Sequence, residues 1–354
     1  MQKLLPLLLL LAGCVAREPA PQPWPELPSI DIGLSAGYRA GVAADGLRNP
    51  SFVSFKPGTG EPTVCDSGNG RVLLITRNGP RTLVGDMATE FWKVLDDGRK
   101  LYQVGPLAAL WLDGETLIVS DSGQPDGKES LLWVTPRGAS GERSEVVAHS
   151  NTIAPTTDDE ADRGEGNLTG FCRDGDTMYV CCHGNDKKTW VAVADLKTRK
   201  LSASFSADDH GIATNSPMQA RLWRGGLLVL YSGAGGVDDG LLVYWNLSSG
   251  KPQQQWKLPG LWDPMGLAQI PGSADEFVVT DNAWALGKVN EGKLARVKLG
   301  DDTTQITVIA NRVPGPVNCD FGPDGELYVT CLGAKIDTDE GVLMRVSGFE
   351  AENR

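Results

Sequence analysis

The sequence of 354 residues is poor in the residue types on which several common functions depend. Only 3 residues are His, aromatic residues make up 7%, and 45 Asp and Glu outnumber 33 Lys and Arg, so the formal net charge is −12. A nucleic-acid-binding surface needs a basic footprint that displaces counterions, so we expect no nucleic-acid partner. The sequence also lacks a Gly-rich phosphate loop, a Gly-x-Ser-x-Gly nucleophile elbow and a His-Glu-x-x-His zinc motif.

The apolar run at the start of the chain is too short to cross a bilayer, which takes about 20 residues. It covers residues 4–11, is broken only by Pro6, and follows a short basic start at Lys3. This pattern predicts a signal peptide over residues 1–13. The run ends in Leu-Ala-Gly-Cys at Cys14, which resembles the lipobox of bacterial lipoproteins. The resemblance implies that Cys14 becomes the first residue of the mature chain and carries a lipid anchor.

The residues that follow Cys14 predict where the anchor holds the protein. Val15 stands where an Asp would resemble the inner-membrane retention signal, so we expect the outer membrane, with the domain facing the periplasm or the cell surface. Five prolines fall within residues 17–31, a composition typical of a semi-extended linker. We therefore expect a lipidated, Pro-rich tether over residues 14–31 and a folded domain over residues 32–354.

Six further cysteines show no zinc-binding spacing. None of them belongs to a Cys-x-x-Cys pair, which is the spacing typical of structural zinc sites. In an oxidising compartment they could form disulfides, but most fall inside segments that we expect to be inner strands, which favours small, buried core residues. These residues are Cys65, Cys172, Cys181, Cys182, Cys319 and Cys331.

The 43 Gly and 22 Pro residues mark a repeated unit. In each unit an apolar run ends in the motif Val-x-Asp-x-Gly, as in residues 64–68. Some copies have another residue in place of the Asp, and one lacks the Gly. The pattern occurs six times, at steps of 49–61 residues. The Val positions are Val64, Val119, Val180, Val229, Val279 and Val329.

Each unit also predicts a strand upstream of this pattern and two strands after it. A proline opens the upstream strand in five units, where it costs no ladder hydrogen bond, and Gly166-Asn167 fills the third slot. These prolines are Pro50, Pro106, Pro217, Pro264 and Pro316. Third strands are expected over residues 71–76, 129–135, 189–195, 240–246, 292–299 and 341–347. Fourth strands are expected over residues 81–85, 144–150, 201–207, 252–258 and 304–310.

Six units of four strands are typical of a β-propeller. We therefore predict an all-β fold, a six-bladed β-propeller with four antiparallel strands per blade. The sixth unit lacks a fourth strand of its own, and residues 36–43 are expected to supply it and close the ring, which removes the open sheet edges. Residues 90–104 leave open a partial seventh blade, and a pair of β-sandwiches is a further alternative.

Two segments resemble the NHL-repeat and SMP-30/gluconolactonase-like six-bladed propellers. One is Asp-Pro-Met-Gly-Leu at residues 263–267, which leads to Val-Thr-Asp-Asn at 279–282, and the other is residues 321–330. The resemblance covers about residues 36–347 of this sequence. It implies the fold and leaves the function open, because such folds host many activities.

The same resemblance gives a test for a metal site. Lactonase-type members bind a divalent metal through Glu, Asn and Asp near the start of the first strand of a blade. At the corresponding positions of this sequence none of the residues is a carboxylate and most are apolar, whereas hard divalent cations need oxygen ligands. We therefore predict no metal site and no cofactor. The positions are Ser51, Leu107, Leu168, Met218, Met265 and Val317.

The default binding surface is the face on which the first strands begin. The loops between second and third strands gather on that same face. Polar residues one position further along the first strands are expected to line the mouth of the central channel. The ligand-binding candidates are Thr169, Gln219 and Asn318 from the strands, and His183, Trp284 and Lys335 from the loops.

Two patterns suggest catalysis or metal binding, but a structural role fits both better. His183 follows Cys182, yet adjacent residues of a strand point to opposite faces, and no third group is evident that would orient the imidazole. A carboxylate recurs at Asp66, Asp121 and Asp281. At these positions we expect it to tie a turn by accepting hydrogen bonds from backbone N–H groups.

Together these features predict a binding module rather than an enzyme. The protein would be held in the cell envelope by its lipid anchor, would act as a monomer, and would bind an envelope protein or a saccharide through its loop face. The alternative is an enzyme with a divergent site, either a hydrolase of lactones or esters or a dehydrogenase of sugars. The sequence does not choose the ligand.

Overall fold

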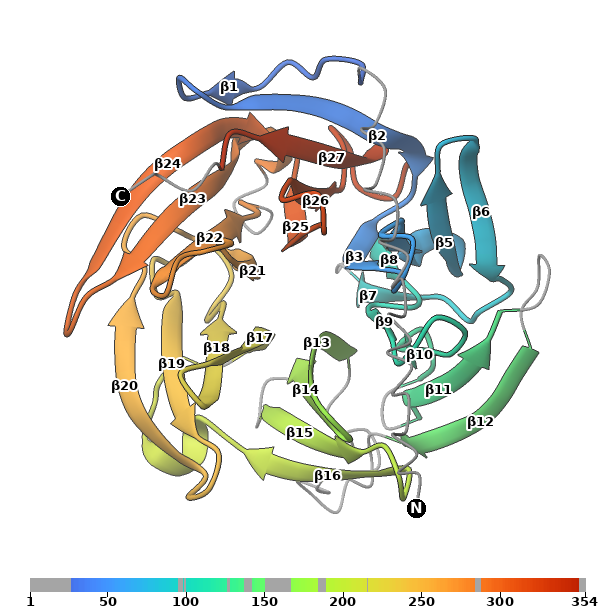
Figure 1. Ribbon diagram of the computed structural model, residues 1–354, viewed down its shortest axis with the longest axis horizontal. Helices are drawn as coiled ribbons and strands as arrows, with labels where there is room; N and C mark the ends of the chain where they lie inside the picture. The colour runs from blue at the N-terminus through green and yellow to red at the C-terminus, as the bar shows by residue number, and fades with distance from the viewer. Residues whose placement is uncertain are drawn as a thin grey trace, which may run out of the picture.

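The computed structural model is an all-β ring of six sheets around a central channel (Figure 1). It describes residues 27–94, 98, 100–125, 128–136, 142–149, 167–183, 189–214, 216–283 and 288–349. Helical structure in these ranges consists of short 3-10 turns. A search of the described residues for a helix long and apolar enough to cross a membrane finds none. The prediction of a six-bladed β-propeller is confirmed.

Each blade is a four-stranded antiparallel meander whose first strand lines the channel and whose fourth strand lies at the outside (Figure 1). Blade one contains β3 (Pro50–Phe55), β4 (Pro62–Asp66), β5 (Arg71–Thr76) and β6 (Gly79–Val84). Blade two contains β9 (Ala109–Trp111), β10 (Leu117–Asp121), β11 (Ser130–Thr135) and β12 (Glu142–His149). Blade three contains β13 (Asn167–Asp174), β14 (Thr177–His183), β15 (Trp190–Asp195) and β16 (Lys200–Phe205).

The second half of the ring repeats the arrangement. Blade four contains β17 (Pro217–Trp223), β18 (Gly226–Tyr231), β19 (Leu241–Asn246) and β20 (Lys251–Lys257). Blade five contains β21 (Pro264–Gln269), β22 (Glu276–Asp281), β23 (Gly292–Leu299) and β24 (Thr304–Val313). Blade six contains β25 (Pro316–Phe321), β26 (Leu327–Cys331) and β27 (Gly341–Ser347), and its outer strand is β2 (Arg39–Leu47).

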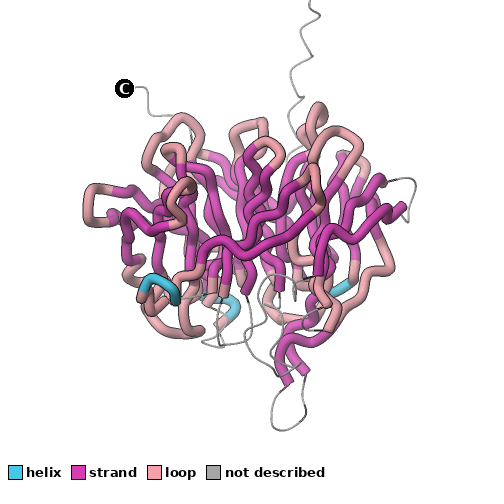
Figure 2. The backbone as a smooth tube through the Cα atoms, turned by 90° about the horizontal axis from the view of Figure 1, so that it is seen from below, coloured by secondary structure: helices cyan, strands magenta, loops and turns pink. Residues whose placement is uncertain are grey.

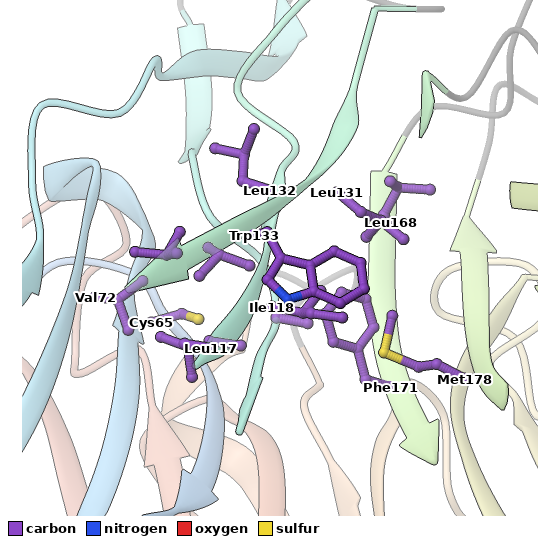
Figure 3. Packing of buried hydrophobic residues seen from close by; sticks show 14 of the residues in the cluster. Cys65, Val72, Leu117, Ile118, Leu131, Leu132, Trp133, Leu168, Phe171 and Met178 are labelled. Atoms are coloured by element: carbon purple, nitrogen blue, oxygen red, sulfur yellow. The ribbon is translucent and has the colours of Figure 1, made fainter. Parts of the chain in front are cut away.

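The inner and outer strands of a blade differ in how their residues are buried. Every residue of the second strands β10 and β22 is buried, because neighbouring blades cover both faces of each sheet. The outer strand β20 instead alternates exposed and less exposed residues, with one face toward solvent. Figure 3 shows part of the resulting core, where Val72, Leu117 and Phe171 from three successive blades belong to one apolar cluster.

Ring closure follows the prediction from residues 36–43. Strand β2 pairs antiparallel with β27, with Arg39 opposite Ser347 and Leu47 opposite Gly341. The strand that joins the last blade therefore comes from the start of the domain. It extends to Leu47 because the chain continues directly, through two residues, into the first strand of blade one.

The alternative of a seventh blade is wrong. Residues 90–104 form a separate two-stranded hairpin of β7 (Glu90–Val94) and β8 (Lys100–Val104). This hairpin lies between blades one and two in the chain and makes no sheet with either. The six sheets form a ring rather than two facing layers, so the sandwich alternative is also wrong.

The propeller begins earlier than residue 32. Pro28 O accepts a hydrogen bond of 2.9 Å from Val42 N, and Ser29 forms a β-bridge with Gly41. A short strand β1 (Gly33–Leu34) then adds a fifth strand to blade five by pairing with β24. Residues 27–31, which we expected in the tether, thus lie against the outer strands, because their backbone and Ile30 find partners there.

The six cysteines of the domain are all buried, and none of them forms a disulfide. Burial raises the pKa of the thiols of Cys65, Cys181 and Cys319, which keeps them protonated at neutral pH. These residues therefore serve as small core side chains, as their position in inner strands suggested.

Candidate functional site

A cavity of about 150 Å³ opens at one mouth of the central channel. It lies on the face where the first strands begin and where the second strands turn into the third, which we call the cavity face. The turns η1 (Ser67–Asn69) and η5 (Val289–Glu291) lie in two of these loops. Figure 2 shows the helical turns gathered toward one side of the ring. The cavity wall contains apolar residues, uncharged polar residues and one carboxylate, Asp263.

In five of the blades a β-bulge near the start of the first strand brings one residue to the cavity. In blade five Pro264 pairs with Asp281 and Leu267 with Val279, so two residues of β21 oppose one of β22. Met265 is the first of these two residues and lines the cavity. Blades one, three, four and six have a bulge at the same place, whereas in blade two Leu107 lines the cavity just before β9 begins.

Blade three requires a correction of one residue. Leu168 pairs with Cys182 at the place where the other blades have their proline, and it is fully buried in the core. Thr169, not Leu168, therefore occupies the cavity-facing position of this blade. The predicted position is one residue too early because this blade has no proline to mark the start of its first strand. The corrected column, all of it in the cavity wall, is Ser51, Leu107, Thr169, Met218, Met265 and Val317.

Hydroxyl groups of the second strands hold three of the strand entries in place. Ser120 Oγ accepts hydrogen bonds from Leu107 N at 3.0 Å and Ala108 N at 2.8 Å. Thr280 Oγ1 accepts Gly266 N at 2.7 Å and donates to Val317 O at 2.8 Å, so it joins blades five and six. These buried bonds make the entries rigid, because each satisfies a backbone group that water cannot reach.

The floor of the cavity is a hydrogen bond that spans the channel. Asn318 Nδ2 donates to Gln219 Oε1 at 3.0 Å, although the two residues belong to blades six and four. Asn318 Oδ1 accepts Val53 N at 3.2 Å, and Gln219 Nε2 donates to Phe171 O and Ala220 O at 3.3 Å. Both amides are buried. The sequence placed these two side chains at the channel, and the structure brings them together there.

The hairpin β7–β8 forms one wall of the cavity through Tyr102 and Val104. The carboxylate of Asp337, from blade six, accepts hydrogen bonds from Tyr102 N at 2.8 Å and Gln103 N at 2.6 Å. Asn49 Nδ2 donates to Asp337 Oδ1 at 2.6 Å and to Gln103 O at 2.9 Å. Blades one and six thus hold the hairpin against the channel mouth.

Backbone strain accumulates at this attachment. Asn49, Tyr102 and Asp337 have φ angles of 45°, 60° and 60°. This left-handed region is uncommon for residues other than Gly and is costly for a bulky one such as Tyr. Strained residues persist where surrounding contacts over-determine them, and they cluster at functional sites. Burial and the neighbouring Asp337 raise the pKa of Tyr102, so its phenol stays protonated.

Two neighbouring residues make the blade-five side of the wall polar. Asp263 and Asn282 line the cavity and are joined by a backbone hydrogen bond from Asn282 N to Asp263 O at 3.0 Å. Asp263 Oδ1 accepts Gly236 N at 2.9 Å. Asn282 Nδ2 donates to Pro316 O at 3.1 Å, while its buried Oδ1 has no hydrogen-bond partner.

Each of the recurring carboxylates ends a second strand, and two of them accept hydrogen bonds from backbone N–H groups. Asp66 Oδ1 accepts Arg48 N at 2.6 Å, and its Oδ2 accepts Arg71 Nε at 2.6 Å. Asp281 Oδ1 accepts Trp262 N at 3.0 Å and Asp263 N at 2.8 Å. Asp121 accepts a hydrogen bond from Gln124 Nε2 at 3.0 Å. For Asp66 and Asp281 these contacts are those of carboxylates that tie a turn.

The loop candidates lie apart from the cavity or outside the described residues. Lys335 is exposed in the loop of blade six and is not part of the cavity wall. His183 ends strand β14, but its side chain lies outside the described part of the structure, and Trp284 lies outside it altogether. Of the strand candidates, Thr169 donates from its Oγ1 to Cys181 O at 3.1 Å and lines the cavity.

Several wall residues were not foreseen from the sequence. Tyr102 and Val104 were missed because their hairpin is not part of the repeat. Asp263 and Asn282 could have been identified from the sequence. Asp263 directly precedes the proline of blade five, and Asn282 directly follows the recurring carboxylate of that blade.

The described wall is poor in ionisable side chains. Among the described residues no three of His, Cys, Asp and Glu gather as metal ligands. The described lining residues include one carboxylate, Asp263, and no Lys, Arg or His. A quinone cofactor with several carboxylates would need cationic partners, so these residues do not fit one.

Comparison with known proteins gives the fold and no nearer relationship. No protein-family model and no curated protein matches the sequence. Among solved structures, a gluconolactonase from Xanthomonas campestris is 11% identical, with a TM-score of 0.58 over 92% of this chain and 98% of that one. A PQQ-bound aldose sugar dehydrogenase from Streptomyces coelicolor is 12% identical, with a TM-score of 0.56 over 89% of this chain and 100% of that one.

A luciferin-regenerating enzyme is likewise 12% identical, with a TM-score of 0.59 over 90% of this chain and 95% of that one. At such identities the similarity establishes the architecture alone. The chain is a six-bladed β-propeller whose structural neighbours include gluconolactonase-like proteins and PQQ-type sugar dehydrogenases.

Proposed function

We propose that this protein is a lipid-anchored binding module of the bacterial cell envelope that takes a small molecule, or one end of a saccharide, into the channel-mouth cavity. The proposed anchor is Cys14, and the proposed location is the outer membrane, facing the periplasm or the cell surface. Both rest on the apolar run and lipobox of the sequence, which lie outside the described residues. The protein would act as a monomer.

The observation that supports binding is the composition of the cavity column. Leu107, Met218, Met265 and Val317 present apolar side chains at the channel mouth, where the lactonases that the sequence resembles hold a metal. A concave, mostly apolar wall with a few placed polar groups is typical of a small-molecule site. A protein partner would need a broad surface of about 800 Å² on each side, so the cavity favours a small ligand over an envelope protein.

Cavity size limits what can enter. A volume near 150 Å³ is comparable to that of a cavity that holds a single benzene-sized ring. A longer ligand would leave its remaining part outside the mouth. One terminal ring of a saccharide therefore fits the proposal, with Tyr102 and the methionines against its apolar face.

Blocking the cavity tests the proposal directly. Met265→Arg would place a long charged side chain in the cavity, and we expect it to weaken the binding of monosaccharides and other ring compounds by about tenfold or more, because overpacking excludes the ligand. Ligand-observed NMR with a panel of such compounds measures this. Lys335→Ala, in the exposed loop, is the control and should bind as wild type does. Equal binding by wild type and Met265→Arg would rule out this cavity.

The second candidate function is an enzyme with a divergent site. The solved neighbours named as gluconolactonase and sugar dehydrogenase favour it at the level of the fold, and Asp263 supplies one buried carboxylate in the cavity wall. Lactone hydrolysis by the purified protein, measured with added Ca²⁺ or Zn²⁺ and with a chelator, separates the two. Turnover that is lost on chelation and in Asp263→Asn would overturn the binding proposal in favour of the enzyme.

The anchor has its own experiment. Cys14→Ala should release the protein from the membrane fraction into the soluble fraction, because the lipid is attached at this residue. A variant that still fractionates with membranes would show that the lipobox interpretation is wrong. This result would leave the cavity proposal untouched.

A further inference from the structure

The polar groups of the cavity wall are unevenly used. Ser51 Oγ donates to Leu107 O at 3.1 Å, and Thr169 Oγ1 donates to Cys181 O at 3.1 Å. Asn282 Nδ2 donates to Pro316 O at 3.1 Å. Each of these donor atoms therefore already makes a hydrogen bond within the protein, while the oxygen atoms of the same side chains keep unused acceptor capacity.

The amide donors of the cavity floor are likewise bonded to protein oxygens. Asn318 Nδ2 donates to Gln219 Oε1 at 3.0 Å. Gln219 Nε2 donates twice, to Phe171 O and to Ala220 O at 3.3 Å. The donor atoms beneath the cavity are thus directed to protein oxygens.

Asn282 Oδ1 is the acceptor that most needs a ligand. Asn282 is 2% exposed, and this oxygen has no hydrogen-bond partner. The orientation of the amide is fixed, because turning it would place an oxygen rather than the NH₂ group against Pro316 O. A buried acceptor left unpaired carries a desolvation cost, and a ligand that donates to it removes this cost.

The charge of the wall acts in the same direction. Asp263 lies beside Asn282 and is 5% exposed, and no described lining residue is cationic. A carboxylate entering the cavity would meet like charge at Asp263 and an acceptor at Asn282, without a cation to offset them. A hydroxyl or an ammonium group would instead donate to Asn282 Oδ1.

We infer that the cavity selects compact ligands by their hydrogen-bond donors and rejects carboxylates, with Asn282 Oδ1 as the anchoring acceptor. The inference rests on the proposed function, since it names the chemistry of the ligand that the same cavity binds. It separates a neutral, hydroxyl-bearing ring from the acid that would form if such a ring were oxidised or opened by hydrolysis.

A series of probes with one ring and one changing group tests the inference. Cyclohexanol, cyclohexylamine, cyclohexanone and cyclohexanecarboxylate share a ring of the size that the cavity accepts. Their affinities are measured by ligand-observed NMR on the full chain carrying Cys14→Ala, which removes the need for detergent. We expect cyclohexanol to bind about tenfold more tightly than cyclohexanone, because only the alcohol pairs the buried oxygen, and the carboxylate to bind weakest. Cyclohexylamine, whose ammonium group also donates, should bind at least as tightly as cyclohexanol. An amine that binds no more tightly than cyclohexanone would contradict selection by donors.

Asn282→Leu removes the acceptor while keeping a side chain of similar size. In this variant cyclohexanol and cyclohexanone should bind equally, so the preference measured with wild type disappears while ring binding persists. Asn78→Leu, in an exposed turn of blade one, should keep the preference. If Asn282→Leu does not fold, the wild-type series still decides.

Two failures are distinguishable. If cyclohexanone or the carboxylate binds as tightly as cyclohexanol to wild type, and Met265→Arg abolishes this binding, the cavity is a ligand site and the donor rule is wrong. If no probe binds in a way that Met265→Arg affects, the proposed function is wrong.

Discussion

Two contacts between the same pair of strands, β17 and β25, differ in their charge. At the cavity end, Gln219 of β17 and Asn318 of β25 form an uncharged hydrogen bond. Two residues further along the same strands, and so on the same strand faces, Arg221 and Asp320 form an ion pair of 3.2 Å. Blades four and six are thus joined twice across blade five, once without charge and once with it.

The charged contact does more than pair two residues. Arg221 Nε donates to Leu267 O at 2.7 Å, and its NH2 group donates to Cys319 O at 3.3 Å. One guanidinium therefore holds main-chain oxygens of two other blades, and we call this end the clamp end. The comparison teaches that the contact beneath the cavity is uncharged, whereas the ion pair lies two residues further along the same strands.

The largest expected effect comes from breaking the clamp. Arg221→Met leaves Asp320 without its cation and two main-chain oxygens without a donor. We expect a loss of about 3 kcal/mol in the free energy of unfolding, near the lower end for a broken buried pair. The lower end applies because 18% of the Arg221 side chain and 31% of the Asp320 side chain remain exposed. Denaturant unfolding measures it.

The double variant Arg221→Met/Asp320→Leu is the control for this first prediction. Replacing both charges by apolar side chains removes the unpaired carboxylate, so most of the lost stability should return. Probe binding at the cavity should stay near the wild-type level in both variants. A clamp variant that folds well and loses binding would show that the two ends are not separate.

At the cavity end the corresponding change is Asn318→Leu. It removes the bond to Gln219 Oε1 and the acceptor for Val53 N. We expect a loss of about 2 kcal/mol in the free energy of unfolding, since two buried partners are left unpaired. Unlike the clamp variant, it should also weaken cyclohexanol binding severalfold. Unchanged binding would mean that the floor does not shape the cavity.

A smaller effect is expected where the hairpin is attached. Asp337→Asn replaces one of the two carboxylate oxygens that accept Tyr102 N, Gln103 N and Asn49 Nδ2. We expect a loss of about 1 kcal/mol, typical of one hydrogen bond, confined to the hairpin. Hydrogen exchange should become faster at the Tyr102 and Gln103 amides and stay unchanged in blade four. Exchange that rises throughout the ring would contradict a local role.

The smallest effect concerns acid sensitivity. Burial opposes ionisation of Glu276 at the clamp end, but its hydrogen bonds and ion pairs with Arg296 and Lys298 outweigh this and lower its pKa. A carboxyl group whose pKa is lower in the folded than in the unfolded protein stabilises the fold at pH values above its unfolded-state pKa of about 4.3. This contribution is lost as the pH falls through the folded-state pKa.

Glu276→Gln should therefore cost less than about 1 kcal/mol at pH 7, because Arg296 and Lys298 are partly exposed. The variant should also lose less stability than wild type as the pH falls below about 4.5. Denaturant midpoints of unfolding, measured between about pH 3 and 7, report this difference. Glu61→Gln, in an exposed turn with Thr59, is the control. A variant that keeps the full acid dependence would exclude Glu276 as its source.

The repeat made the architecture readable from the sequence. Each blade must place a buried second strand between two neighbours, so Val64, Val119 and their counterparts recur at nearly constant steps. The third strand expected over residues 292–299 agrees with β23 to the residue. The boundaries that drifted furthest belong to outer strands, where burial constrains the sequence less.

The cavity was readable only in part. Gln219 and Asn318 were identified because they follow the strand entry in the repeat. Tyr102 and Asp337 were not, since their positions depend on a hairpin inserted between blades and on a contact between residues 235 positions apart. A repeat predicts what every blade shares, whereas a binding site is made of what single blades add.

Ring closure by β2 also determines the order of events when the chain folds. Arg39 and Ser347 are paired in the finished ring, although they lie at opposite ends of the domain. Contacts of such high sequence separation form slowly, because the entropy of closing the loop must be overcome first. Strand β2, one of the first to be synthesised, is therefore among the last to find its partner, and blade six remains a three-stranded sheet with an open edge until β2 pairs with β27.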